Sequence, residues 1–556
     1  MATGSVRSSA FLPGETFRPP WRQRRGSRRE RKDEMTKGRE ESDDRVVPED
    51  RRKAVPTPVS PGGGKAVTAS EAPRQLGLFF ETADSPQGDV AGADGDRSLP
   101  ALRAVPKSKD TRGPVTAAMT MEEVAEEGNL FEAFRRVKAN DGASGPDRQS
   151  IEEVDEHILE ILPELSRKLL DETYRPGMIR RVWIPKAGGG QRGLGIPNVV
   201  DRIVAQAVNQ VMSPVYEPTF HASSHGFRPG RSCHTAIAEA KSHLEAGYEW
   251  VVDFDLEKFF DRVNHERLLA RLEQRVTDRR LHRLIRRMLK AKVVMPDGVV
   301  VSTEEGTPQG GPLSPLLSNI VLDELDHEMA RRGYRFVRYA DDTNVYVRSE
   351  RSGKRVMASI VRFIEGKLRL KVNLAKSAVA KPEERHFLGF RLRREPLDGT
   401  VEVLLSVRSK DRAAEAIKTK TPRNWGQSLV TCIKSLNVFL MGWIAFFWIC
   451  TAAEERTLQN LDAHIRRRLR ALVLRHWKRR RTIARRLIKL GVKPKTAWRR
   501  VYEGRKALWA LSHDPAVDRG LRNAYFAERG LVSLLERWRV LRERAIAPAQ
   551  PALEWG

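Results

Sequence analysis

The chain has 556 residues, with 100 Lys or Arg against 72 Asp or Glu, which gives a formal net charge of +28. This length exceeds what one hydrophobic core usually serves, so about two to four domains are expected. A positive excess of this size favours polyanionic partners, chiefly nucleic acid. Three cysteines without a CxxC pair argue against a disulfide framework or a structural zinc site, and for a reducing cytoplasm.

The first 115 residues are predicted to form a disordered leader, because Pro, Gly, Ser and mixed charges dominate them without a lasting hydrophobic period. Residues 116–400 are predicted to be an α+β unit. In its first part, apolar residues recur at helical spacing from 121 to 170, with a break at the glycine-rich "ANDGASGPD". After about residue 175, β-rich runs such as "RRVWIP" and "NVYVR" alternate with helical stretches.

The remainder of the chain, divided here into residues 401–484 and 485–556, reads as helices with Arg-rich faces. Residues 435–453 carry no charge over 19 positions, which is long enough for a membrane-spanning helix. However, Asn437 and Gly442 interrupt this segment, and its tryptophans lie in its interior rather than at its ends. We therefore predict a buried helix and no membrane partner.

The segment "FVRYADDTNVYVRS", residues 336–349, reads as a β-hairpin with two adjacent carboxylates, Asp341 and Asp342. Apolar and aromatic residues alternate at strand spacing on both sides, and residues 341–344 supply the turn chemistry. For this match taken alone, a solvated turn is the simpler interpretation.

A second acidic pair occurs upstream in "EWVVDFDLEKFFDRVNH", residues 249–265, where strand alternation places Asp253 and Asp255 on the same face. A carboxylate that emerges from a buried strand is costly unless a cation meets it, so it is a candidate metal ligand. If Asp255 meets Asp341 and Asp342, three carboxylates can hold two Mg²⁺ ions about 3.5–4 Å apart, the arrangement that serves phosphoryl transfer. Such cations also offset the repulsion between adjacent carboxylates.

Two glycine-rich segments suit the same chemistry. "IPKAGGGQRGLGIP", residues 184–197, reads as a loop in which Lys186 and Arg192 can fold over a triphosphate. "GTPQGGPLSPLLSNI", residues 306–320, brings backbone amides and Gln309 close to a large ligand and then starts a helix at its Ser-Pro step. Each segment alone could be an ordinary loop, but the set in this order is specific.

With these segments the chain resembles the group II intron-encoded reverse transcriptases of the maturase type. The resemblance runs from about residue 125 to 395 through successive blocks: "AFRRVKANDGASGPD", "WIPKAGGGQRGLGIPNVVDRIVAQAV", "SSHGFRPGRSCHTAI", "VVDFDLEKFFDRVNH", "GTPQGGPLSPLLSNIVLDELD", "FVRYADD", "LKVNLAKS" and "HFLGF". It implies an α+β right-hand polymerase with fingers and palm in residues 116–400. It also implies an all-α thumb and maturase domain in residues 401–484 and a basic DNA-binding region in residues 485–556.

The resemblance also implies roles for single residues. It supports Asp255, Asp341 and Asp342 as catalytic Mg²⁺ ligands, with Asp253 as the alternative to Asp255. It places Phe260 where the family excludes a 2′-hydroxyl from the incoming nucleotide. The other positions matched to the nucleotide site are Lys186 and Arg192 on the triphosphate, Gln309 at the nucleotide and template, and Lys376 as the acid that protonates pyrophosphate.

Basic residues concentrate in the helical half. Residues 461–510 contain 18 Lys or Arg and two acids, interleaved with tryptophans, which suits binding to RNA and to strand backbones. A solvated basic face over core tryptophans is the alternative. The residues expected to bind RNA or DNA are Arg228, Arg231, Arg466, Arg467, Arg470, Lys478, Arg479, Arg480, Arg485 and Arg486. In the "SHGFRPGRSCH" block, template contact or packing is favoured over a His-metal site because the spacing is poor for zinc.

The sequence thus predicts an RNA-directed DNA polymerase that uses Mg²⁺ and dNTPs, binds its intron RNA to assist splicing, and copies it from a DNA target or primer. Two alternatives stay open: a retron-like or domesticated reverse transcriptase, and an RNA-binding splicing cofactor in which polymerisation is incidental. No HNH endonuclease is expected, since CxxC pairs are lacking. A cytoplasmic, nucleoid-associated location is expected. The sequence leaves open the intron, the primer source and the oligomeric state, a homodimer included.

Overall fold

The structure, a computed structural model, describes residues 119–185, 190–422, 426–505 and 507–546. Every described residue belongs to one compact unit. The predicted leader, residues 1–115, and Lys186 lie outside the described residues.

Helices open the described part of the chain at the positions where apolar residues recur. They are α1 (Met121–Ala125), α2 (Glu127–Ala139), α3 (Ile151–Glu156), α4 (Ile158–Leu170) and, after two strands, α5 (Val199–Tyr216). Thr120 and Ser150 begin α1 and α3 with capping boxes, in which each hydroxyl accepts from the amide three residues on. Leu130, Phe134 and Leu169, which lie at the predicted spacing, are at most 3% exposed, so these helices are confirmed.

One four-stranded sheet follows the order β2-β1-β4-β5, with strands β1 (Ile179–Pro185), β2 (Gln191–Ile196), β4 (Val293–Val294) and β5 (Val300–Val301). Strand β2 corrects the prediction that residues 184–197 form only a loop. Its glycines fit because β1 supplies bulk beside them: a Cβ at Gly193 would lie 2.7 Å from Nη1 of Arg181 and 3.1 Å from the Trp183 ring. The antiparallel ladder with β1 then holds β2 in place.

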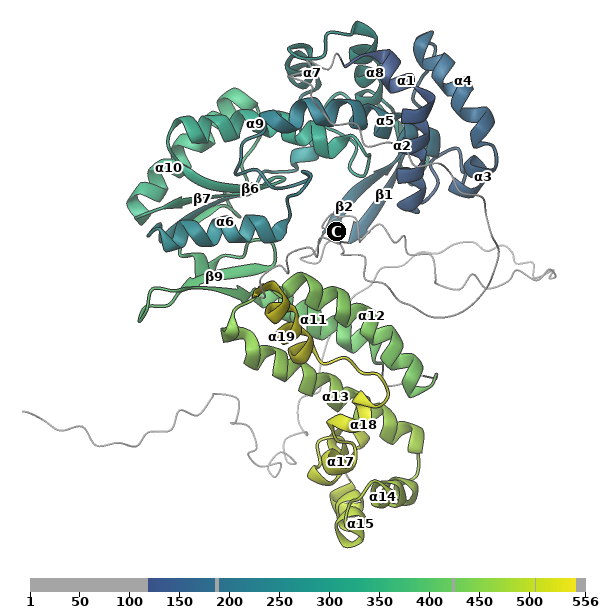
Figure 1. Cartoon of the computed structure of the whole chain (residues 1–556), viewed down its shortest axis with the longest axis vertical. Helices are drawn as coiled ribbons and strands as arrows, with labels where there is room; N and C mark the ends of the chain where they lie inside the picture. The colour runs from purple at the N-terminus through teal and green to yellow at the C-terminus, as the bar shows by residue number, and fades with distance from the viewer. Residues whose placement is uncertain (1–118, 186–189, 423–425, 506, 547–556) are drawn as a thin grey trace, which may run out of the picture. The chain divides into compact units, whose positions relative to one another are not determined.

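A second four-stranded sheet has the order β6-β7-β3-β8, and all its neighbours are antiparallel. Its strands are β3 (Trp250–Phe254), β6 (Arg335–Tyr339), β7 (Asp342–Val347) and β8 (Ala378–Ala380). The helices in contact with this sheet are α6 (Cys233–Glu245), α9 (Ser314–Arg331) and α10 (Glu350–Phe363), whereas α7 (His265–Glu273) packs against α9 and α8 (Arg279–Leu289) packs against α7. Val252 shares a hydrophobic cluster with α9 and α10, whereas Val251 shares another with α6. Helices therefore cover both faces of this sheet (Figure 1).

The β6–β7 hairpin turns more tightly than predicted. Tyr339 pairs with Asp342, so the turn consists of Ala340 and Asp341 instead of residues 341–344. Ala340 has a φ of +56°, in the left-handed region that favours glycine and that costs an alanine free energy. Asp341 thus lies in the turn, and Asp342 begins β7.

The sheet-containing part ends with the antiparallel hairpin of β9 (Phe390–Arg394) and β10 (Val401–Leu405). Helices follow: α11 (Val407–Lys420), α12 (Leu429–Phe447), α13 (Glu455–Trp477), α14 (Arg480–Lys489), α15 (Pro494–Tyr502), α16 (Leu508–Leu511), α17 (Pro515–Gly520), α18 (Asn523–Ala527) and α19 (Leu534–Ile546). Within the described ranges no strand occurs after β10, as the sequence predicts.

Helix α12 contains most of the uncharged segment. Cys432, Leu436 and Leu440 face a hydrophobic cluster, whereas Val438 is 78% exposed. Among the described residues, α12 is the one helix whose length and composition would suffice to cross a membrane, and 28% of that window is buried. The prediction of a buried helix is therefore right for one face only. The other face can meet solvent, because an exposed uncharged side chain costs far less free energy than a buried charge.

Candidate active site

The first aspartate of the β3 pair is held by protein groups. Arg385 donates to Oδ2 of Asp253 through Nη2 at 2.6 Å and through Nε at 2.9 Å. The Asn344 amide, in the orientation that satisfies its neighbours, donates to Oδ1 at 3.2 Å. Burial raises the pKa of Asp253, and the Arg385 contact acts against that rise. Both carboxylate oxygens of Asp253 are therefore engaged within the protein.

The second aspartate, Asp255, lies just past the end of β3 and is anchored through its backbone. Its amide donates to Oγ of Ser377 at 3.0 Å, and its carbonyl accepts from the Asn373 amide at 2.8 Å. Its side chain is 37% exposed, and Nζ of Lys376 lies 3.6 Å from Oδ2. Asp255 is thus the more available ligand of the pair, and Lys376, predicted as a general acid, is its neighbour.

The aspartates of the β6–β7 turn lie in the electrostatic field of the β3 pair. Burial raises the pKa of Asp341, and the charge of Asp255 raises it further. Asp342 reaches solvent, yet the surrounding protein and the charges of Asp341, Asp253 and Asp255 raise its pKa to about 7. The positive charge of Arg192 lowers the pKa of both Asp341 and Asp342. The four carboxylates therefore form one interacting group with a cation nearby.

This donor set suits a divalent cation chemically, since hard oxygen ligands that repel one another are stabilised by a shared positive charge. Asp255, Asp341 and Asp342 are the ones that would hold it, because Arg385 and Asn344 occupy Asp253. Within the described ranges, however, no three His, Cys, Asp or Glu side chains lie close enough together to ligate an ion as they stand. The carboxylates would have to close around the cation.

The segments predicted to contact the nucleotide lie side by side. The Gly195 amide of β2 donates to the Gln309 carbonyl at 2.8 Å, and a Cβ at Gly310, whose φ is +107°, would lie 2.8 Å from Leu194. The Thr307 amide donates to the Phe260 carbonyl at 2.6 Å. The loop at residues 306–313 therefore joins β2, which carries Arg192, to the short 3₁₀ turn that carries Phe260.

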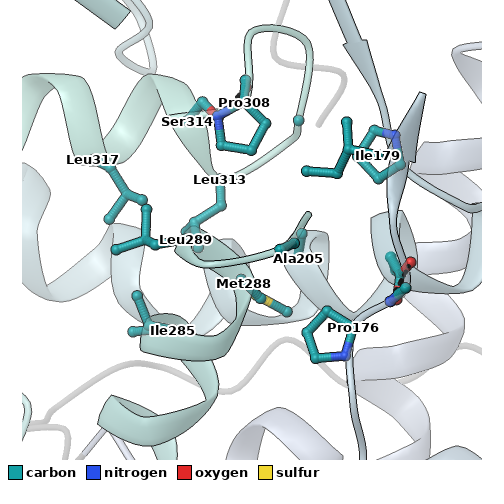
Figure 2. A pocket seen from close by; sticks show the side chains of 15 residues that line it. Pro176, Ile179, Ala205, Ile285, Met288, Leu289, Pro308, Leu313, Ser314 and Leu317 are labelled. Atoms are coloured by element: carbon teal, nitrogen blue, oxygen red, sulfur yellow. Dashed lines mark hydrogen bonds between the residues drawn. The ribbon is translucent and has the colours of Figure 1, made fainter. Parts of the chain in front are cut away.

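The loop at residues 306–313 also lines an apolar pocket of about 60 Å³ (Figure 2). Pro308 and Leu313 of the loop contribute to its lining, together with Ile179, Ile285 and Met288. Its lining is mostly apolar, with Asp201 as its one acidic residue, and the four interacting carboxylates do not line it. The candidate active site is instead the region around the carboxylates.

One predicted nucleic-acid contact is contradicted. Arg228 is 9% exposed; it donates to the Glu217 carboxylate at 2.8 Å and to the carbonyls of His221 and Ser224 at 2.7 and 2.9 Å. Its guanidinium therefore braces its own loop and is not available to a template. Arg231, which is partly exposed, donates to the Ala222 carbonyl at 2.5 Å.

Both histidines of that block make contacts within the protein, which agrees with packing, one of the two interpretations that the sequence favours. His225 is 3% exposed and pairs with Glu239 at 2.7 Å and with Thr235 at 2.9 Å. His234 bonds the Phe446 carbonyl at 2.7 Å.

The basic helices divide into bound and exposed arginines. Arg467 packs 4.9 Å from the Trp509 ring, and Arg470 pairs with Asp518 and donates to the Leu521 carbonyl. Arg480 donates to the Val501 carbonyl, and Arg466 is partly exposed. By contrast, the remaining predicted contacts are exposed: Lys478, Arg479, Arg485 and Arg486. The surface open to nucleic acid is therefore narrower than the sequence suggests.

The sequence interpretation missed Arg338. This residue of β6 is fully buried and donates to the Ala340 carbonyl at 2.9 Å, directly before Asp341. A signal was present, because Arg338 interrupts an apolar strand, "RFVRYA", three residues before the acidic pair. Its partners, however, come from distant segments that alternation cannot identify.

Comparison with known proteins agrees with this geometry. Residues 184–392 match the family described as reverse transcriptase (RNA-dependent DNA polymerase), and residues 410–488 match the group II intron, maturase-specific domain. The chain is 31% identical to Protein YkfC of Escherichia coli over 353 residues, which are 56% of this chain and 89% of YkfC. It is 34% identical to the group II intron-encoded protein LtrA of Lactococcus lactis over 247 residues, 44% of this chain and 41% of LtrA.

Among solved structures, a telomerase from Candida albicans gives a TM-score of 0.34 at 13% identity, covering 58% of this chain and 63% of that one. The sequence relatives are much nearer, and both domains of the family occur here in the same chain. The chain belongs to the group II intron-encoded reverse transcriptase and maturase family.

Proposed function

We propose that this protein is an RNA-directed DNA polymerase that also binds its intron RNA to assist splicing, and that supports intron mobility by target-primed or nascent-strand-primed cDNA synthesis. The observation that carries the polymerase function is the group of carboxylates at the end of β3 and the β6–β7 turn, with Arg192 and Lys376 beside it. The maturase function is supported by the maturase-specific domain and the exposed basic residues of the helical part. A cytoplasmic protein that joins the nucleoid when bound to DNA fits this function.

In this proposal Asp255, Asp341 and Asp342 hold Mg²⁺. When bound, a pair of such ions favours ionisation of the primer 3′-hydroxyl and neutralises the triphosphate. Arg192 attracts the triphosphate to the site by its positive charge.

The primer 3′-oxygen forms a bond to the α-phosphorus while the bond to pyrophosphate breaks. Lys376 is 65% exposed and close to Asp255, so its ammonium group can reach the leaving pyrophosphate and supply the proton. Phe260, fixed between Phe259 and the 306–313 loop, limits the space at the sugar.

The first experiment measures Mg²⁺-dependent extension of a DNA primer on an RNA template by the purified protein and by Asp255→Ala. We expect extension by the unsubstituted protein and none above background by the variant. Asp253→Asn is the matched control, because that side chain is engaged by Arg385 and should retain extension. Extension retained by Asp255→Ala and lost in Asp253→Asn would identify Asp253, and not Asp255, as the metal ligand.

The alternative, an RNA-binding splicing cofactor in which polymerisation is incidental, is favoured by the exposed basic residues alone. Tight binding of intron RNA by a folded, unsubstituted protein that extends no primer would place this alternative first.

A further inference from the structure

A buried ion pair lies beside the β6–β7 turn, and the proposed chemistry gives neither of its members a role. Arg338 of β6 and Asp326 of α9 are both 0% exposed, and Arg338 is the largest fully buried side chain in the described residues. Nε of Arg338 donates to Oδ1 of Asp326 at 2.7 Å, and Nη2 donates to Oδ2 at 2.5 Å. A buried ion pair is weak evidence for stability, because desolvating both charges offsets much of their attraction. Its position therefore needs another reason.

The remaining N–H groups of Arg338 show what the pair holds. Nη1 donates to Oδ1 of Asn319 at 3.0 Å and to the Ala340 carbonyl at 2.9 Å, and Nη2 donates to Oγ of Ser224 at 2.7 Å. With the two groups on Asp326, all five N–H donors of the guanidinium are used. One of them fixes the peptide that links Ala340 to Asp341.

That peptide needs external support. Ala340 adopts a φ of +56°, which costs an alanine free energy and persists only where the surroundings enforce it. The loop at residues 223–226 encloses the turn from the edge of β6: a Cβ at Gly226 would lie 2.2 Å from the Ala340 amide nitrogen. The Arg338 amide and carbonyl bond Ser223 and His225 of the same loop at 2.9 and 2.8 Å.

Helix α9 extends this network to the nucleotide loop. Asn319 and Asp326 are seven residues apart and so lie on one face of the helix. Asn319 also donates to the Gly226 carbonyl at 2.9 Å, which ties the 223–226 loop to the helix. The same helix begins at Ser314, whose hydroxyl donates to the Pro308 carbonyl beside Gln309. One rigid element therefore connects the loop with Gln309 to the turn with the carboxylates.

We propose that Arg338 is a positioning residue of the polymerase: paired with Asp326, it clamps the Ala340 carbonyl and so fixes the backbone from which Asp341 and Asp342 project. This inference rests on the proposed polymerase function. Lysine cannot replace arginine here, because a single ammonium group cannot bond Asp326, Asn319, Ser224 and Ala340 in one plane. The pair acts on the turn, and the carboxylates act on the substrate.

The test separates positioning from stability with the double variant Arg338→Met, Asp326→Leu. Replacing both members of a buried ion pair with apolar residues of similar size commonly preserves stability, but it removes the donor to Ala340. We expect the double variant to fold, with a melting temperature lowered by no more than about 10 °C, because Asn319 and the Ala340 carbonyl lose their donor. We expect kcat for primer extension to fall by about 10²-fold, because small misplacements of reacting groups have effects of that size, with KM for dNTP nearly unchanged.

A second readout needs neither metal nor substrate. Hydrogen exchange of the peptide spanning residues 336–345 should become faster in the metal-free double variant, since the turn loses its clamp. The matched control is Asp323→Asn on the same helix, whose ion pair with Arg271 at 3.1 Å does not reach the turn. The control should leave kcat and the exchange of this peptide unchanged.

The outcomes are distinct. A folded double variant with kcat within about threefold of the Asp323→Asn control would overturn the proposal. If the double variant does not fold, Arg338→Lys decides, since it keeps the buried positive charge: lost kcat with unchanged KM supports positioning, and full kcat overturns it. Absence of extension by the unsubstituted protein would instead overturn the proposed function, and this inference with it.

Discussion

The palm, which is the β6-β7-β3-β8 sheet with helices α6, α9 and α10, and the helical part, residues 407–546, use charge in opposite ways. In the palm, Arg338 and Asp326 are fully buried and bonded to named partners, and Asp253 is held by Arg385. Residues 461–510 contain 18 basic residues and only two acidic ones, and many of the basic side chains are exposed. Buried pairs fix geometry, whereas unpaired surface cations provide a field for a polyanion. Substitutions of the buried pairs in the palm should therefore lower kcat. Substitutions of the surface cations in the helical part should lower the affinity for RNA and its salt dependence.

The comparison also holds inside the helical part. Arg468 of α13 is 8% exposed and donates to the carbonyls of Lys418 and Thr421 at 3.1 and 2.7 Å, so it joins helices in the same way that Arg338 joins strand, helix and loop. Burial, more than residue type or local charge density, thus decides which arginines are structural.

The largest expected effect comes from removing the turn carboxylates. The variant Asp341→Ala, Asp342→Ala should reduce cDNA synthesis to background, because the proposed metal ligands are lost. Affinity for intron RNA should stay within about threefold, since the exposed cations of the helical part are unchanged. Splicing of the cognate RNA by this variant, measured beside cDNA synthesis, should persist. Loss of both activities in a folded variant would mean that the two regions are not separable.

The second effect concerns the exposed cations. Replacing Lys478, Arg479, Arg485 and Arg486 with Gln should weaken intron RNA binding by about 10²–10³-fold at 0.1 M salt and reduce the slope of log K against log salt by up to about 3. Binding across a salt series gives both values.

The control for this variant changes the same amount of charge at exposed positions of the palm: Arg351, Arg355, Arg362 and Lys367. An equal loss of affinity in the control would show that net charge, and not the position of the cations on the maturase helices, determines binding.

Strand alternation was sufficient to find β3, β6 and β7, because buried strands with polar ends carry a strong local signal. It left open whether Asp255 meets the Asp341–Asp342 pair, and the family resemblance, not alternation, favoured Asp255 over Asp253. Alternation failed at Arg228 and Arg338. Their partners, such as Glu217 and Asp326, come from other elements, and whether an arginine is buried depends on those contacts.

Strand β2 was missed for the same reason. Its glycines predict a loop locally, but the ladder with β1 and the side chains of Arg181 and Trp183 stabilise an extended strand. Long-range pairing overrides the local preference.

A third prediction uses a partly buried carboxylate outside the active site, Glu239. Burial alone would raise the pKa of Glu239, but hydrogen bonds from His225 and Ser223, with the His243 ring 3.7 Å away, lower it to about 2. A carboxyl whose pKa is lower in the folded than in the unfolded state, where it is about 4.3, stabilises the fold above the unfolded value. That contribution is lost as the pH falls toward about 2.

Glu239→Gln should therefore reduce the free energy of unfolding at pH 7 by about 2–3 kcal/mol and flatten its fall between about pH 5 and 2. Urea unfolding at a series of pH values measures both. An unchanged acid dependence in the variant would place the acid sensitivity of the protein in other carboxylates.

The smallest expected effect tests the wall at the sugar. Phe260 is 8% exposed, packs edge-on against Phe259 with ring centroids 5.3 Å apart, and is joined to Thr307 through its carbonyl. Phe260→Val should open space for a 2′-hydroxyl, so the ratio of kcat/KM for dNTP to that for rNTP should fall by about tenfold or more, with dNTP use nearly unchanged. Phe259→Leu is the control, because Phe259 is the more deeply buried of these two rings in the same hydrophobic core, at 2% exposed. It should lower thermal stability without changing the ratio. An equal change of the ratio in both variants would mean that loosened packing, and not a specific wall, sets the choice of sugar.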